Sequence, residues 1–430
     1  PVMLAQLIQA LYNIVDSFFV GKYSETGLTA LSIIYPVQLL MIALGVGTGV
    51  GINTDMAYYL GIGKKKKAEE VAGTGTPLGL ILWIIFAAVC YVTLPAYAGM
   101  STDSPEVIRD VVAYGRIVCL FSIGLFTEGI WSKILQAEGD MRTPMIAQIA
   151  GAVVNIILDP LLIFGMLGMP EMGISGAAVA TVVAQGISAV LCAIYIMRKC
   201  KILIPAREHF KVDGPLYREL TGQGLSMGFM LAIVSTGTVI LQYAINQLGY
   251  LIIAGHTAAR KLNSFCSLPL MPLAMATATF VSQNRGADQR DRILKVVRYA
   301  MILSVGWAVF ITVMVAFAAP SLIALLSGSS ESVVLENGVR YIRWNTPFYS
   351  VLGILLVLRN VLQGLGKKVV PLVSSMIEMV GKIAFVLLFI PILKYFGVII
   401  CEPVIWCLMC IQLVISYYRD PYIRGKEEKK

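Results

Sequence analysis

The chain contains 430 residues, of which 57% are hydrophobic and only 14% are charged. A soluble protein carries about 25% charged residues. This chain therefore has too few to cover a water-facing surface, which excludes a soluble globular protein. Its formal net charge of +9 does not indicate a nucleic-acid partner, because the basic residues gather in every second loop between apolar segments. That placement is the positive-inside pattern of membrane proteins, and we expect the lipid bilayer as the surrounding partner.

Twelve apolar segments follow one another along the chain, and each can cross a bilayer, which takes about 20 mostly apolar residues. Strand-like alternation of polar and apolar residues is absent from the sequence, so helices must satisfy the backbone polar groups in lipid. The sequence thus predicts an all-α integral membrane protein with twelve transmembrane helices. Their expected ranges are residues 1–20, 32–60, 72–96, 111–136, 144–167, 173–197, 222–247, 251–282, 296–326, 338–363, 370–393 and 397–418.

The twelve predicted helices divide into two similar halves. ILQAEGDMRTPM at the end of the fourth helix and VLQGLGKKVVPL at the end of the tenth superpose at an offset of 227, which aligns Gln136 with Gln363 and Pro144 with Pro371. Near the first helix of each half, VGKYSETGLTA and LGYLIIAGHTA match at an offset of 228. Two distant landmarks that agree indicate an internal repeat. Because each half has an even number of helices, both enter the membrane from the same side, as in the parallel repeats of some secondary transporters.

The longest break between helices is a charged, proline-containing segment in mid-chain, which we interpret as a linker between two pseudo-symmetric six-helix lobes. The expected division is an N-terminal lobe over residues 1–197, a cytoplasmic linker over 198–219, a C-terminal lobe over 220–418 and a basic cytoplasmic tail over 419–430. The richly basic loops place both termini in the cytoplasm. Since the chain begins with Pro1 rather than Met, we expect further residues before it in the full-length protein.

Ionisable residues inside the predicted helices are rare, and they are costly in lipid unless paired or hydrated. Asp16 lies late in the first helix. Asp159 lies in the fifth, with Asn155 one turn earlier on the same face, and Pro160 frees the carbonyl of Ile156. Such oxygen atoms suit a hard monovalent cation, and a buried carboxylate can bind a proton instead. We predict a cation or proton site here, over the alternative that both aspartates only hydrogen-bond to neighbouring helices.

The second half carries a different set of charges. Glu378 and Lys382 lie one turn apart in the eleventh helix, with the acid before the base, which is the favourable order for a helical ion pair. A structural pair is favoured here over a secondary role in binding substrate. Arg260 lies near the outer start of the eighth helix, Arg359 lies deep in the tenth, and the sequence identifies no partner for Glu402 in the twelfth.

The sequence motifs do not support an enzyme or a metal site. The glycine-rich GVGTGVG lies inside an apolar run without the Lys-Ser/Thr ending of a nucleotide loop, so it predicts close helix packing. Two isolated histidines do not make a metal site, and the eight cysteines lie mostly in apolar runs. We therefore expect no catalytic residues, no bound metal and no cofactor.

Several of these segments carry a resemblance to a known family. VDSFFVG, LQAEGDMRTP and NIILDP in the first half, with WNTPFY and LQGLG in the second, resemble signatures of the multidrug and toxic compound extrusion (MATE) family over the whole chain. The resemblance implies two lobes around a central cleft and export driven by inward flow of protons or sodium ions. It also implies small amphiphilic, cationic substrates and a prokaryotic cell membrane. Because the two lobes complete the cleft within one chain, we expect the protein to function as a monomer.

The resemblance assigns roles to individual residues of the first half. It implies a cation-responsive cluster of Asp16, Asn155, Asp159 and Thr181, and a substrate cavity lined by Gln9 and Tyr12. Some family members use a second acidic site in helices seven and ten. The membrane parts of those helices contain no Asp or Glu here, so we expect coupling at the first-half cluster.

Three rival functions remain at this stage. A lipid-linked oligosaccharide flippase of related two-lobe architecture would need several cationic residues to hold pyrophosphate, and only Arg260, Arg359 and Lys382 lie deep. A major-facilitator exporter would carry a Gly-Asp-Arg-Gly-Arg-type turn where this chain has GIGKKKKAEE. The repeated halves and the acidic cluster argue against a scaffold or receptor without transport activity.

Overall fold

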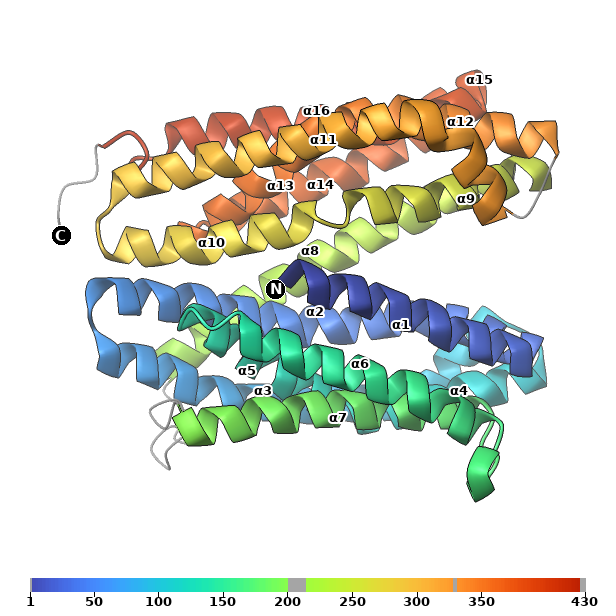
Figure 1. Cartoon of the computed structure of the whole chain (residues 1–430), viewed down its shortest axis with the longest axis horizontal. Helices are drawn as coiled ribbons and strands as arrows, with labels where there is room; N and C mark the ends of the chain where they lie inside the picture. Colours follow the sequence, from blue (N-terminus) through green and yellow to red (C-terminus); the bar gives the residue numbers. More distant parts are fainter. Residues whose placement is uncertain (1, 200–213, 328–330, 426–430) are drawn as a thin grey trace. The chain divides into compact units, whose positions relative to one another are not determined.

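The computed structural model describes residues 2–199, 214–327 and 331–425. Throughout these ranges the regular elements are helices, and none is a strand. The chain divides into two compact units, Pro1–Gly228 (unit 1) and Phe229–Lys430 (unit 2), whose helices can be followed by colour and label in Figure 1.

The number of membrane spans agrees with the sequence. Ten helical stretches of the described residues are long and apolar enough to cross a membrane, and a bent pair of shorter helices, α4 (Pro105–Leu120) and α5 (Ile123–Ala137), makes an eleventh. At the position of the first predicted span lies α1 (Val2–Tyr23), a helix of 22 residues, which brings the number to twelve. The prediction of an all-α membrane protein with twelve transmembrane helices, six in each unit, is therefore confirmed.

The remaining helices of unit 1 are α2 (Glu25–Ile62), α3 (Lys65–Ser101), α6 (Arg142–Ile163) and α7 (Ile174–Lys199), with the short 3-10 helix η1 (Met166–Gly168) before α7. Close contact between α6 and α7 depends on Gly176, where a Cβ atom would lie 2.5 Å from the carbonyl oxygen of Leu162. Membrane helices associate through such small residues because the backbones can then touch. This contact sets the spacing of the two helices that carry Asp159 and Thr181.

Unit 2 takes up most of α8 (Gly214–Asn246) and continues with α9 (Tyr250–Ser267), α10 (Leu270–Gly286), α11 (Arg290–Ser327), α12 (Ser332–Asn345), the 3-10 helix η4 (Thr346–Phe348), α13 (Tyr349–Gly364), α14 (Val369–Ala384), the π-helix η5 (Phe385–Phe389), α15 (Ile390–Leu393) and α16 (Tyr395–Arg419). The predicted span 111–136 of unit 1 bends by 44° between α4 and α5, and two spans of unit 2 that were predicted as single helices are also interrupted. One breaks between α9 and α10 and the other at η4, next to Pro269 and Pro347, which lack the N–H group that a helix needs.

The repeat offset of 227 corresponds to a shared turn. Gly139, after α5, and Gly366, after α13, both adopt a left-handed conformation, with φ of 92° and 75°. In each turn the next residue donates its N–H to a carbonyl five residues back, at 3.0 Å in unit 1 and 2.9 Å in unit 2, which is a standard way to end a helix. At the first turn of each unit, α2 begins at residue 25 and α9 at residue 250, an offset of 225 rather than the 228 taken from the sequence.

The expected linker over residues 198–219 is shorter at both ends than the sequence suggested. α7 continues to Lys199, and α8 begins at Gly214, where Pro215 suits the first turn of a helix. Residues 200–213, between these helices, lie outside the described residues, as do residues 426–430 of the tail.

Candidate functional site

Unit 1 contains a cavity of about 460 Å³ between α1, α2, α4, α5 and α7. Three residues that the sequence analysis named line it: Gln9 and Asp16 from α1, and Thr181 from α7. The side chain of Tyr12, the other residue expected to line a substrate cavity, lies outside the described part of the chain. Among the described lining residues, only Asp16 carries a charge.

The cavity wall also has neutral polar groups that the sequence analysis missed. Gln38 from α2 donates a hydrogen bond to the hydroxyl of Tyr114 from α4 at 3.1 Å, and Gln185 lies one turn beyond Thr181 on α7. Uncharged amides in apolar helices gave the only available signal. That signal is weak because an amide is less costly in lipid than a charge.

Asn155 and Asp159 lie on α6, next to the cavity-lining helices. Both are fully buried, and Nδ2 of Asn155 donates to Oδ1 of Asp159 at 3.2 Å, so they share one helix face as their spacing predicts. Asp16 lies on α1, which packs against α6. The hydroxyl of Thr181 donates to the carbonyl of Ala177 at 3.0 Å. We call Asp16, Asn155, Asp159 and Thr181 the acid cluster.

The acid cluster has buried oxygen atoms that lack donors. Oδ1 of Asp16, Oδ1 of Asn155, Oδ2 of Asp159 and the neighbouring Oε1 of Gln185 are all buried, and none accepts a hydrogen bond from a described residue. No ion pair among the described residues includes either aspartate. Buried polar atoms are nearly always satisfied in proteins, and oxygen atoms are the ligands that hard cations prefer. This arrangement can bind a monovalent cation or a proton.

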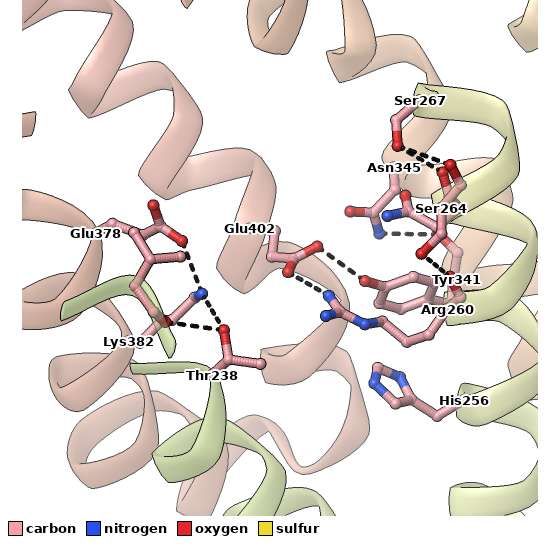
Figure 2. A network of polar contacts seen from close by, with 12 residues as sticks. Thr238, His256, Arg260, Ser264, Ser267, Tyr341, Asn345, Glu378, Lys382 and Glu402 are labelled. Atoms are coloured by element: carbon pink, nitrogen blue, oxygen red, sulfur yellow. Dashed lines mark hydrogen bonds and ion pairs between the residues drawn. The ribbon is translucent and has the colours of Figure 1, made fainter. Parts of the chain in front are cut away.

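Unit 2 has a second buried polar network, in which the carboxylates do have partners (Figure 2). Nζ of Lys382 donates to Oε1 of Glu378 at 2.8 Å and to Oγ1 of Thr238 at 3.0 Å. Nη1 of Arg260 lies 2.5 Å from Oε1 of Glu402. The hydroxyl of Tyr341 donates to the other oxygen of Glu402 at 3.0 Å.

The sequence found one of these two ion pairs. Glu378 and Lys382 are neighbours on one helix, so their spacing was sufficient to predict the pair. Arg260 and Glu402 lie on α9 and α16, 142 residues apart, and no local pattern links them.

Comparison with known proteins gives a consistent result. A protein-family model described as MatE matches residues 1–161 and 227–388. The probable multidrug resistance protein YoeA of Bacillus subtilis (strain 168) is 25% identical over 97% of this chain and 91% of its own length. The probable multidrug resistance protein NorM of Thermotoga maritima is 25% identical over 88% of this chain and 81% of its own. The crystal structure of MATE in the bent conformation is 21% identical and superposes with a TM-score of 0.90, covering 99% of this chain and 94% of that one; this last likeness shows the fold.

Proposed function

We propose that this chain, which belongs to the MATE family of multidrug efflux transporters, exports small amphiphilic cations in exchange for protons or sodium ions bound at the acid cluster. Members of the family are transporters and not enzymes, so the residues of interest bind and release rather than catalyse. The observation that carries the proposal is that the buried carboxylates of Asp16 and Asp159 form no ion pair with any described residue, and that Asp16 lies on the wall of a cavity.

The chemistry of the cavity favours a cationic substrate. Its apolar wall can hold an amphiphile, its amides and hydroxyls can orient polar substituents, and Asp16 supplies the negative charge. A broad apolar pocket with a few polar groups restricts size and charge only loosely, as multidrug export requires.

Coupling follows if the exported cation and the imported ion bind different conformations with different affinity. An ionised Asp16 attracts the substrate. A proton or sodium ion at the acid cluster removes that attraction and stabilises a state that releases the substrate. Each ligand shifts the equilibrium only by its differential affinity for the two conformations.

A lipid-linked oligosaccharide flippase is the less favoured function. Holding a pyrophosphate calls for Arg and Lys side chains, and none of the described residues that line the unit 1 cavity is basic.

The basic loops support our further proposal that both termini are cytoplasmic, in the inner membrane of a prokaryote. Because unit 1 alone contains both the cavity and the acid cluster, we also propose that the protein functions as a monomer.

The test is efflux of a fluorescent organic cation from proteoliposomes, with sodium and proton gradients imposed separately. Export by the native chain should follow one of the two gradients, and that gradient identifies the ion. Asp159→Asn should abolish the gradient dependence. The conservative change Asp103→Asn, at an exposed position of the same unit, should leave it intact. Gradient-driven export that survives Asp159→Asn would contradict coupling at the acid cluster.

A further inference from the structure

Helix α11 of unit 2 presents an apolar stripe on its exposed side. From Ile302 to Leu325 the helix rises about 35 Å, at about 1.5 Å per residue, which is close to the roughly 30 Å of the hydrocarbon core of a bilayer. The stripe therefore faces lipid, and the hydrocarbon core ends near Ile302. The exposed large apolar side chains that form the stripe are Ile302, Leu303, Val309, Phe310, Val313, Phe317 and Leu325.

Three basic side chains continue the same side of α11 beyond the end of the stripe. Arg298, Lys295 and Arg292 are all exposed. They lie about 6, 10 and 15 Å before Ile302 along the helix axis. The headgroup region extends about 5 to 7 Å beyond the hydrocarbon core, and long basic side chains bend along an apolar surface to place their charge there. The three side chains can therefore reach lipid phosphate groups.

An aromatic side chain marks the same boundary. Tyr299 is 63% exposed, and it lies between the basic side chains and the apolar stripe. Tyrosine is enriched at the interface between membrane and water, because its ring is apolar and its hydroxyl is polar. Its position agrees with the boundary that the length of the stripe gives.

Nearby basic residues of unit 2 already have partners within the chain. Nε and Nη2 of Arg290 donate to the carbonyl of Ile423 at 2.9 and 2.6 Å. Nζ of Lys367 lies 3.2 Å from Oδ2 of Asp420. These contacts attach the segment after α16 to the turns at this end of unit 2, so Arg290 and Lys367 have a structural role.

The three basic side chains beside the stripe differ in this respect. None of the ion pairs among the described residues includes Arg292, Lys295 or Arg298. The exposed carboxylate of Asp291 precedes all three on the helix and lies farther from the stripe. Three exposed positive charges at the level of the headgroups can therefore attract an anion from outside the chain.

A basic run alone does not make such a surface, as α3 of unit 1 shows. Lys64, Lys65 and Lys66 are exposed at its start, but the next exposed large apolar side chain described on this helix is Ile81. About 22 Å of helix separate Lys66 from Ile81. The corresponding gap in α11 is about 6 Å, so its basic side chains adjoin the surface that faces lipid.

We propose that Arg292, Lys295 and Arg298 form a binding site for the phosphate of an anionic lipid, whose acyl chains lie along the apolar stripe of α11. Under the topology proposed above, this lipid belongs to the cytoplasmic leaflet. A lipid matches both the basic and the apolar part of the surface, whereas a soluble anion would contact the basic part alone. All residues of the site belong to unit 2, so it is independent of the cavity and the acid cluster.

The experiment uses the full chain in detergent, titrated with dioleoyl phosphatidylglycerol or, for comparison, with the zwitterionic dioleoyl phosphatidylcholine. Native mass spectrometry counts the lipids bound. The native chain should bind phosphatidylglycerol saturably and more tightly than phosphatidylcholine. Combining Arg292→Gln, Lys295→Gln and Arg298→Gln should raise the Kd for phosphatidylglycerol by about tenfold or more, because three attractive charges are lost. The Kd for phosphatidylcholine should stay within about twofold.

Two further variants separate a local site from the overall charge of the protein. Combining Lys64→Gln, Lys65→Gln and Lys66→Gln removes the same charge from unit 1 and should leave the Kd for phosphatidylglycerol within about twofold. Arg292→Lys with Arg298→Lys keeps the charge and should retain most of the affinity. Equal weakening by both neutral triple variants would overturn the site, because binding would then follow net charge.

A competition experiment distinguishes a lipid from a soluble anion. Glycerol phosphate carries the charge of the headgroup without acyl chains, so an excess of it should displace little phosphatidylglycerol from the native chain. Complete displacement would overturn the lipid assignment in favour of a soluble anion. Equal affinity of the native chain for the two lipids would overturn the anion site itself. Because the readout is lipid binding, neither outcome depends on whether the chain exports cations.

Discussion

The two units share a helical plan, but the carboxylates of the acid cluster in unit 1 and those of the polar network in unit 2 differ in their partners. In unit 1, Asp16 and Asp159 lie on two helices that pack together, with no cationic partner among the described residues. In unit 2, Glu378 and Glu402 each accept from a basic side chain. A carboxylate without a partner can gain one from solution, so it suits exchange of an ion. A carboxylate that is already paired stays charged and fixes its helices in place.

Because the two units are repeats of each other, a feature that both units contain belongs to their common fold, and a feature of one unit alone does not. Both units end their fourth span with a left-handed glycine at the same offset, so that turn belongs to the plan. The acid cluster and the two ion pairs of unit 2 do not, since Asn155 in one unit stands where Lys382 stands in the other.

The largest expected effect is at Asp16. Asp16→Asn keeps the shape of the side chain and removes its charge, and we expect gradient-driven export to fall by about 100-fold, the upper range of coupling between two ligands. Because Oδ1 of Asp16 has no hydrogen-bond donor to lose, thermal unfolding of the purified protein should not occur at a lower temperature. If Asp16→Asn lowered the unfolding temperature and left export coupled to the gradient, Asp16 would have a structural role, which would contradict our proposal.

Glu402 should behave in the opposite way. Glu402→Gln leaves Arg260 without its carboxylate, which lowers the free energy of unfolding. Removing one partner of a buried pair costs several kcal/mol. The Arg260 side chain is 36% exposed, so we expect about 2 kcal/mol. Thermal unfolding in detergent measures the change, and Glu336→Gln, at an exposed glutamate of unit 2, is the control. An unchanged unfolding temperature would show that the pair does not hold α9 to α16.

A smaller effect is expected at the contact between α6 and α7. Gly176→Ala would place a methyl group 2.5 Å from the carbonyl oxygen of Leu162, and relieving that overlap should cost about 1.5 kcal/mol. Export should fall as well, because the shift would separate Asp159 from Thr181. Gly306→Ala, where a Cβ atom would meet nothing within 4 Å, should change neither quantity. If export by Gly176→Ala were unchanged, Thr181 would not belong to the acid cluster.

The smallest effect tests the similarity of the units. Gly139→Ala and Gly366→Ala each force a residue with a side chain into a left-handed conformation, at a cost of about 1 kcal/mol. Two separate measurements of thermal unfolding should give similar shifts, slightly larger at Gly366, where a Cβ atom would lie 3.1 Å from Nη1 of Arg285, and export should be unaffected. Clearly unequal shifts would mean that the two turns do not play the same part in their units.

Part of the candidate site could be predicted because its members are close in sequence. Asn155 and Asp159 are four residues apart on one helix, as are Glu378 and Lys382, and both contacts are present. Gln185, Gln38 and the partner of Glu402 could not be predicted, because their neighbours come from other helices. The breaks beside Pro269 and Pro347 were also missed, since hydropathy does not distinguish a straight span from a broken one.

The sequence by itself determined the class of fold. A membrane interior solvates neither charges nor unpaired backbone groups, so long apolar segments must be helices, and their number and the repeat can be read directly. Only the tertiary structure decided which buried charges have partners, because an ion pair depends on distances of a few ångströms between helices far apart in the chain. That difference separates the acid cluster of unit 1, whose carboxylates have no cationic partner among the described residues, from the paired carboxylates of unit 2.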